Sequence, residues 1–155
     1  MYKNIMLALD GSKISDSMVE EVIKLTKGQK TNLRIVHVVD ESFVYYGGQD
    51  FDYLSLIAAC QAAGRNILAK AAETITSQSS VKVETSLLEL KPFHKRVSEV
   101  IVEEAAKCHA DLLIIGTHGR RGFSHLLLGS VAENIMRIAT TPVLLVRGSD
   151  KHQSL

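Results

Sequence analysis

The sequence predicts one α/β domain built on an open, five-stranded parallel sheet that is doubly wound, with helices on both faces. Its 155 residues fit one ordinary domain and leave little room for a second. Apolar runs of strand length alternate with segments of helical periodicity in the order β-α-β-α-β-α-β-α-β. The runs 5–9 and 112–115 are continuously apolar, which indicates strands buried on both faces at the centre of the sheet.

The first half of the chain contains strands over 5–9 and 33–39 and helices over 15–27 and 52–76. The first strand ends at the turn signal Asp10-Gly11-Ser12. Gly28 is typical of a helix C-terminus. The first helix has one apolar face, formed by Ile14, Met18, Val22 and Leu25. The second helix interrupts its pattern with Gly64, which costs about 1 kcal/mol relative to alanine. Its residues expected to face inward are Leu54, Ile57, Ile67, Leu68, Ala71 and Ile75.

The second half begins with a strand over 81–87, where apolar and polar residues alternate. Such half-exposure is typical of the margin of a sheet. Pro92 is expected to open a helix over 93–108, with its buried face formed by Val97, Val100, Ile101 and Ala105. Ser130-Val-Ala-Glu133 has the pattern of a capping box. The helix that it opens carries Val131, Ile135 and Ile138, ends at Thr141-Pro142 and leads to a last strand, Val143–Val146.

The strand order follows from the two central strands. If 5–9 and 112–115 are neighbours, right-handed crossovers give the order 3-2-1-4-5. The order then reverses between strands 1 and 4, and open α/β sheets bind ligands at such a reversal, beyond the carboxyl ends of the strands. Asp10 ends strand 1 and Gly116 ends strand 4. The Asp10 turn and the glycine-rich stretch 116–129 should therefore meet.

The glycine-rich stretch has the composition of a phosphate site. Glycine lets backbone N–H groups approach an anion without a Cβ in the way. Gly129-Ser130 precedes a helix, and free N–H groups at a helix N-terminus favour phosphate. The stretch contains neither G-x-x-x-x-G-K-[ST] nor G-x-G-x-x-G. A flexible glycine loop is the alternative interpretation.

A family resemblance then narrows the interpretation. Gly116, Gly119, Gly129 and Ser130 form G-x-x-G, nine residues, then G-[ST]. This pattern resembles the ATP-binding signature of the nucleotide-binding branch of universal stress proteins. Similar flanks are Asp10, His37-Val38, Ala110–Gly116 and Thr141–Val146. The resemblance implies a Rossmann-like, adenine nucleotide alpha hydrolase-like domain over residues 1–147, with a polar tail over 148–155.

The resemblance also implies a set of contacts with ATP, or with AMP or ADP. Asp10 would lie toward the ribose, and Val38 would offer backbone groups to the adenine edge. Gly116 and Gly119 would flank the ribose and phosphates. The phosphates would be held by the N–H groups of Gly129, Ser130 and Val131 and by the Ser130 hydroxyl. Mg²⁺ or Mn²⁺ would bridge the phosphates. The stretch 87–94 departs from the family, which often has a glycine there.

Side chains at the predicted site leave several questions open. Asp10 could contact the ligand or only stabilise its own turn. Arg120 and Arg121 could reach phosphates or remain solvated charges. His118 and His125 have no visible catalytic partner, so no catalytic residue is assigned. The histidines also lack metal-ligand spacing, so no side-chain metal site is expected.

Composition excludes several classes of partner. The net charge of +1 gives no electrostatic case for nucleic acid or a membrane surface. No apolar run is long enough for a transmembrane helix or a signal peptide, so the expected location is the cytoplasm. Cys60 and Cys108 are expected to be reduced, buried thiols. A disulfide or a metal site is the alternative for them.

The leading hypothesis is an ATP-binding regulatory module for stress responses with slow or no hydrolysis. It would form a homodimer through Val143–Val146, an apolar strand expected at a sheet edge, and act on an unknown protein partner. One alternative is a dimeric protein-interaction module of the same family with an empty pocket. The other is an ATP-hydrolysing or adenylyl-transferring enzyme, although S-G-G-x-D-S is absent after strand 1.

Overall fold

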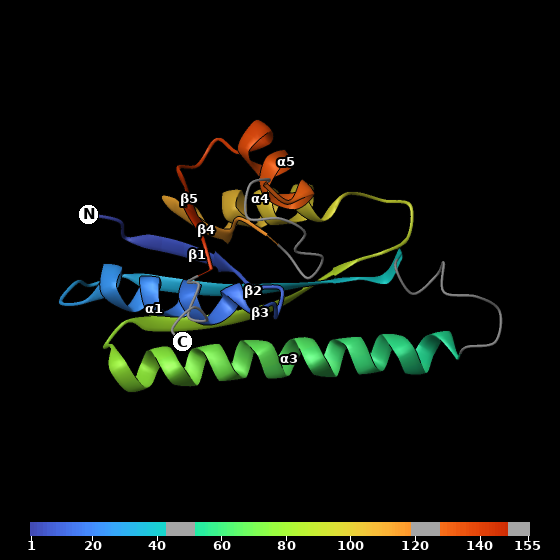
Figure 1. Ribbon diagram of the computed structural model, residues 1–155, viewed down its shortest axis with the longest axis horizontal. Helices are drawn as coiled ribbons and strands as arrows, with labels where there is room; N and C mark the ends of the chain where they lie inside the picture. Colours follow the sequence, from blue (N-terminus) through green and yellow to red (C-terminus); the bar gives the residue numbers. More distant parts are fainter. Residues whose placement is uncertain (43–51, 119–127, 149–155) are drawn as a thin grey trace, which may run out of the picture.

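The computed structural model describes residues 1–42, 52–118 and 128–148. Strands and helices alternate along these residues (Figure 1). They are β1 (Asn4–Ala8), α1 (Ile14–Thr26), β2 (Asn32–Asp40), α3 (Tyr53–Gln78), β3 (Lys82–Leu90), α4 (Val97–Lys107), β4 (Leu112–Gly116), α5 (Ser130–Ile138) and β5 (Val143–Val146). No helix among these residues has the length and apolar composition needed to cross a membrane.

The five strands form one parallel sheet in the order β3-β2-β1-β4-β5. The predicted fold class and strand order are therefore confirmed. β1 lies at the centre, where Met6 and Leu7 have no exposed surface. Successive residues of a strand point to opposite faces, so both faces of β1 are covered. This is the burial that its continuous apolar run predicts.

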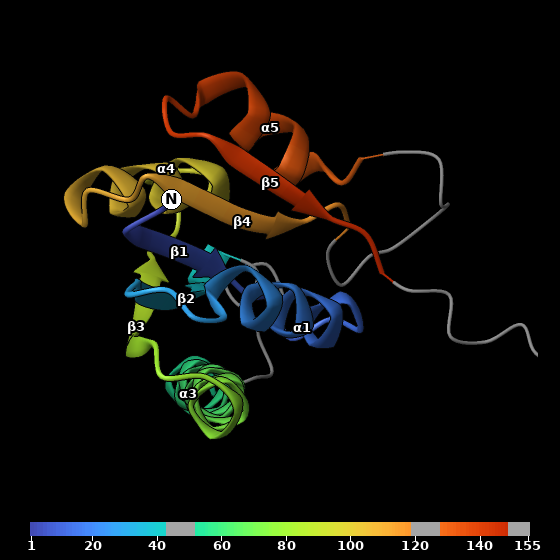
Figure 2. The same ribbon diagram turned by 90° about the vertical axis from the view of Figure 1, so that its left-hand side faces the viewer.

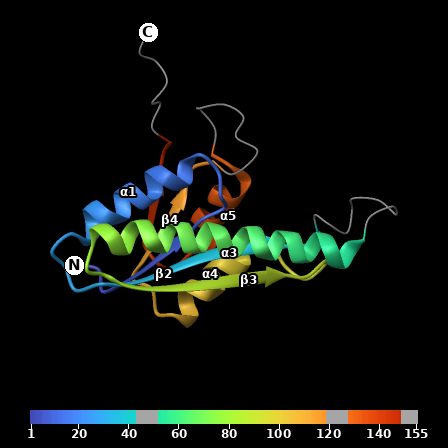
Figure 3. The ribbon, with the colours of Figure 1, turned by 90° about the horizontal axis from the view of Figure 1, so that it is seen from below.

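Helices cover the sheet on both faces. α1 and α3 lie on one face and α4 and α5 on the other (Figure 2). Figure 3 shows α3 alongside α1, spanning the length of β2 and β3. Two separate apolar cores result, one on each face. The core under α1 and α3 includes Leu7, Val22, Ile35, Ile75 and Ile114. The core under α4 and α5 includes Met6, Val36, Ile101, Leu113 and Ile135.

Gly64 is explained by the packing of α3. A Cβ at this position would lie 2.7 Å from His37 Cδ2 and 2.7 Å from Leu87 Cδ1. The helix therefore comes so close to β2 and β3 here that a larger side chain would have to displace His37 and Leu87. Gly64 lowers the helix propensity of α3 locally, and it also lets this helix approach the sheet.

The predicted start of the third helix is wrong. α4 begins at Val97, not at Phe93, and Pro92 does not open it. The Glu99 carboxylate accepts the Arg96 N–H at 2.8 Å, which fixes the first turn at this point. Phe93 instead lies in the left-handed region, with φ 63° and an exposed side chain. Phe93 therefore adopts a conformation that favours glycine, within the stretch 87–94, where the universal stress proteins that the sequence resembles often have a glycine.

The predicted capping box at Ser130 is also wrong. Gly129 is the N-cap of α5, with φ −62° and ψ 156°, and Ser130 is the first helical residue. The Gly129 carbonyl accepts the Glu133 N–H at 2.9 Å, so the backbone ladder begins one residue earlier than the pattern indicates. The cap makes no side-chain hydrogen bond. Ser130 therefore does not hold the helix end.

Some expected core positions are exposed. Leu54 is 77% exposed in the first turn of α3, ahead of Ile57, the first buried residue of that helix. Val131 and Ile138 of α5 are also exposed. Cys60 is exposed as well, which contradicts its expected burial. Periodicity gives the angle of a side chain around a helix, but burial also requires an element opposite it.

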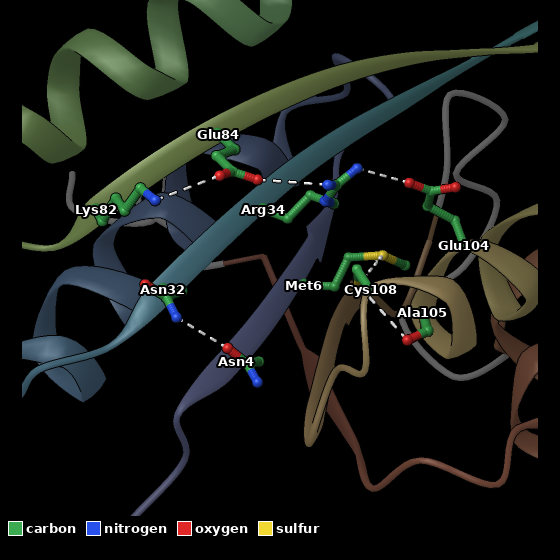
Figure 4. Close-up of polar contacts among 9 residues, drawn as sticks. All are labelled: Asn4, Met6, Asn32, Arg34, Lys82, Glu84, Glu104, Ala105 and Cys108. Atoms are coloured by element: carbon green, nitrogen blue, oxygen red, sulfur yellow. Dashed lines mark hydrogen bonds and ion pairs between the residues drawn. The ribbon is translucent and has the colours of Figure 1, made fainter.

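An ion-pair network centred on one residue of β2, Arg34, joins this strand to α4 and β3. The Arg34 guanidinium lies 2.8 Å from Glu104 of α4 and 3.3 Å from Glu84 of β3 (Figure 4). Cys108 lies nearby, with its Sγ 4.0 Å from Met6 Sδ. Burial raises the pKa of the Cys108 thiol, since the thiolate would lose hydration. Both cysteines are free thiols.

Truncating Ile135 should test how α5 is held. Ile135 has no exposed surface, whereas Ile138 of the same helix is 43% exposed. Ile135→Ala should lower the free energy of unfolding by about 2–5 kcal/mol, because it leaves a cavity. Ile138→Ala, the same chemical change, should alter it by less than about 0.5 kcal/mol. Urea unfolding followed by circular dichroism measures both, and equal losses would contradict the assigned packing.

Candidate functional site

The candidate site lies where β1 and β4 end. The two strands are neighbours in parallel register, with Ile5 opposite Leu112 and Leu7 opposite Ile114. Their carboxyl ends lie at one edge of the sheet, so the turn after β1 and the segment after β4 start side by side. The strand order reverses between them. The structure thus brings together the two segments that the sequence predicts to meet.

Asp10 organises the turn after β1. Its Oδ1 accepts the Ser12 N–H at 2.9 Å, and Gly11 between them has φ 79°. A side-chain acceptor two residues before its donor is an Asx turn, and the left-handed residue inside it favours glycine. Asp10 therefore stabilises its own turn, and this turn fixes the carboxylate at the switch point.

Val38 lies on a part of β2 that extends beyond β1. The β1–β2 register ends at Ala8 and Val36, whereas β2 continues to Asp40 beside β3. The Val36 carbonyl accepts the Leu9 N–H at 2.9 Å. Backbone groups of residues two apart on a strand point to the same side. The N–H and C=O of Val38 therefore point past the end of β1, toward the switch point.

Gly116 lies in a tightly packed position within the protein. A Cβ here would lie 3.2 Å from Ile14 Cγ2 and 3.3 Å from both the His118 carbonyl and Met18 Sδ. The glycine lets the N-terminal part of α1 approach the end of β4. The first glycine of the signature thus has a structural role apart from any ligand.

Thr117 closes the base of the glycine-rich segment. Its N–H donates to the Val146 carbonyl at 3.0 Å, and its carbonyl accepts the Gly129 N–H at 2.8 Å. Gly129, near the end of the glycine-rich segment, is therefore hydrogen-bonded to the buried Thr117 near its start. Thr117 was not among the residues predicted from the sequence, because both bonds are made by its backbone and leave no signal in residue type. Since the Gly129 N–H is engaged, it is not available to an anion in this arrangement.

The start of α5 presents further donors. The first helical N–H groups lack an acceptor within their own helix; they belong to Ser130, Val131 and Ala132. The first bond of the helix is from the Glu133 N–H to the Gly129 carbonyl. Ser130 and Val131 are exposed. Such a helix end is suited to binding an anion.

Other predicted residues fall outside the described part of the chain. Gly119, Arg120, Arg121 and His125 all lie within 119–127. His118 is described: its Nδ1 lies 2.9 Å from Thr117 Oγ1, and its buried Nε2 has no hydrogen-bond partner in the part of the chain that the structure describes. Among the residues that the structure describes, no three His, Cys, Asp or Glu side chains gather as a metal site would require.

A groove of about 850 Å³ runs between α1 and α3. It starts at Gly11 and Ser12 and follows the helices away from the switch point, toward Lys24 and Gln78. Both lysine and acidic side chains line the groove, including the Asp16–Lys70 ion pair at 3.9 Å. We assign the site to the switch point rather than to this groove, because the convergent backbone groups lie at the strand ends.

Comparison with known proteins extends over nearly the whole chain. A model of the universal stress protein family matches residues 1–147. Universal stress protein MJ0531 of Methanocaldococcus jannaschii is 31% identical over 151 residues, which cover 97% of this chain and 85% of that protein. Universal stress protein A homolog 1 of Coxiella burnetii is 30% identical over 148 residues, covering 94% and 96% of the two chains.

Solved structures share the fold. The structure of MJ0577 has a TM-score of 0.84 at 24% identity and covers 97% of this chain and 99% of its own. A universal stress protein in complex with cAMP has a TM-score of 0.65 at 23% identity, covering 96% and 98%. The Archaeoglobus fulgidus universal stress protein in complex with dAMP has a TM-score of 0.62 at 21% identity, covering 94% and 98%.

Two substitutions at Asp10 should separate its turn from its charge. Asp10→Ala removes the acceptor of the Ser12 N–H and should lower the free energy of unfolding by about 1 kcal/mol. Asp10→Asn keeps an acceptor oxygen and should stay close to the wild type. Thermal and urea unfolding measure both variants. A wild-type stability for Asp10→Ala would show that the turn does not depend on this bond.

Proposed function

Because the chain belongs to the universal stress protein family, we propose that it binds ATP at the switch point between β1 and β4 and acts as a nucleotide-dependent regulatory module. The observation that carries this proposal is the extension of β2, which turns the backbone of Val38 toward the switch point. Relatives of the same fold in complex with cAMP and dAMP support an adenine nucleotide as the ligand.

The backbone of Val38 suits adenine in particular. Its N–H is a donor and its C=O an acceptor on the same side of the strand. Adenine presents an acceptor at N1 beside a donor at its 6-amino group, so the two edges are complementary. Guanine presents an acceptor at O6 beside a donor at N1, so both contacts would be mismatched. On this proposal Asp10 lies toward the ribose, where its second oxygen suits a hydroxyl group.

The phosphates are assigned to the start of α5. There the N–H groups of Ser130 and Val131, the Ser130 hydroxyl and the helix dipole favour an anion. Gly129 leaves room for the phosphates because it has no side chain, but it does not donate to them, since its N–H donates to the Thr117 carbonyl. Gly119 and Arg120 are proposed as further contacts. Bound Mg²⁺ or Mn²⁺ would neutralise phosphate charge, held by the nucleotide's own oxygens.

The proposed activity is regulation with slow or no ATP hydrolysis. A general base in a hydrolase is usually oriented by a second polar group. The described hydrogen bond of His118 is to the Thr117 hydroxyl, and no carboxylate from residues 1–42, 52–118 or 128–148 bonds its other nitrogen. This arrangement does not favour catalysis by His118. The second candidate, a protein-interaction module with an empty pocket, is supported by the apolar edge described below.

Calorimetry with ATP and GTP tests the proposed function. We expect ATP to bind and GTP to bind at least about tenfold more weakly. Two mismatched hydrogen bonds between the Val38 backbone and guanine should cost roughly 1–3 kcal/mol. Protein freshly purified without added nucleotide should first be denatured and any released small molecule identified. Absence of binding by any adenine nucleotide would remove the proposal and favour the interaction module.

Two variants locate the phosphates. Gly129→Val should abolish ATP binding and leave the fold intact, because φ −62° and ψ 156° suit a β-branched residue. Ser130→Ala removes no helix cap, so any loss of ATP affinity reports the hydroxyl itself. Circular dichroism and unfolding curves serve as controls. Unchanged ATP affinity in Gly129→Val would contradict the phosphate assignment.

We also propose that the protein pairs with a second copy through β5. This strand lies at one edge of the sheet, and its apolar residues Val143–Val146 carry no charge. α5 lies on the β5 side of the sheet (Figure 2), and three of its apolar residues are exposed: Val131, Met136 and Ile138. The residues of β5 are half-buried or buried, but an uncharged strand at the edge of a sheet favours pairing with another strand.

Sedimentation velocity tests this pairing. We expect a dimer at micromolar concentrations, and a charged substitution at the centre of the edge, Leu144→Lys, should shift it toward monomer. Lys27→Glu, on an exposed position at the end of α1, is a control for a change of charge alone. A monomer at all concentrations in the wild type would contradict the pairing.

A further inference from the structure

His37 lies between the two predicted nucleoside contacts. It directly precedes Val38 in β2, and its Nδ1 lies 2.8 Å from the carbonyl oxygen of Leu9, which directly precedes Asp10. The side chain is only 6% exposed. A carbonyl oxygen can only accept, so Nδ1 carries the proton and donates. One imidazole thus ties the extension of β2 to the end of β1.

This hydrogen bond takes the place of a rung of the sheet. In a parallel ladder, a residue donates to one partner residue and accepts from the residue two further along. Leu9 donates to the Val36 carbonyl, so a continued ladder would have the Leu9 carbonyl accept the Val38 N–H. Between these two described residues that bond is not formed, and the paired register stops at Ala8. The acceptor is taken by His37 instead.

We propose that His37 is the positioning residue of the base subsite. By drawing the Leu9 carbonyl toward Nδ1 and out of the direction of the ladder, its imidazole keeps the Val38 N–H at the open edge for adenine. The inference rests on the proposed function, because it assigns to His37 the availability of a group that the nucleotide would use. His37 itself makes no contact with the nucleotide in this arrangement.

α3 packs against the imidazole ring of His37 and restricts its position. At Gly64, the space that a Cβ would fill is already approached by His37 Cδ2 at 2.7 Å and by His37 Nε2 at 3.3 Å. The helix backbone therefore covers the imidazole and restricts its rotation. Gly64 on one side and the Leu9 carbonyl on the other fix the ring, which gives the mid-helix glycine a role in the site as well as in packing.

Substitutions at His37 test the proposal through the Val38 amide. His37→Leu fills the space without a donor, so Val38 should bond to Leu9, its amide hydrogen exchange should slow, and ATP affinity should fall by about tenfold or more. Affinity for pyrophosphate should not change. His37→Asn places an amide donor near the position of Nδ1 and should restore both fast exchange and ATP binding. Nuclear magnetic resonance and calorimetry provide the two measurements.

Gly64→Ala is an independent variant that leaves residue 37 intact. Its methyl group would displace the ring, and we expect the same selective loss of ATP affinity. Ile75→Val, a buried change further along α3, is the control for reduced stability and should bind ATP like the wild type. Wild-type ATP affinity or unchanged Val38 exchange in His37→Leu would overturn the proposal. Failure of the wild type to bind ATP would instead remove the proposed function, while the exchange measurement would still decide the role of His37.

Discussion

The paired register between β1 and β2 stops where Ala8 lies opposite Val36, whereas β2 continues four residues further to Asp40. The surroundings of the switch point depend on this early stop. Because β1 ends first, the chain can turn at Asp10 while β2 continues beside β3. The backbone beyond the stop has no strand on one side. A sheet of equal strands would have closed this edge with its own hydrogen bonds.

The fold follows from the sequence because burial and periodicity agree. The continuously apolar strands are central, the alternating strand 82–90 is at the margin, and the last strand is at the opposite edge. Element ends were predicted less well. Ser130 and Pro92 have the residue types of helix starts, but the helices begin elsewhere. The Gly129 carbonyl accepts the first hydrogen bond of α5, and the Arg96 N–H donates to the Glu99 carboxylate at the start of α4. Residue type gives a preference, and the neighbouring backbone determines whether it is used.

The candidate site could be predicted only in part. Asp10 and Gly116 follow from topology, since any polar or glycine residue at the ends of β1 and β4 must meet at the switch point. Val38 came from the family resemblance alone, because its side chain is apolar and the relevant groups belong to its backbone. Thr117 was missed for the same reason. The position of Gly64 against His37 required the three-dimensional packing of α3.

The adenine contact proposed at Val38 is made by main chain, and this has an evolutionary consequence. Any residue except proline at position 38 supplies the same N–H and C=O, so drift among apolar side chains there would leave base recognition unchanged. Relatives that share about a third of their residues with this chain could therefore keep one ligand preference without any shared side chain to mark it. Specificity would be inherited through the lengths of two strands, and an insertion or deletion in β1 would alter it more than most point substitutions.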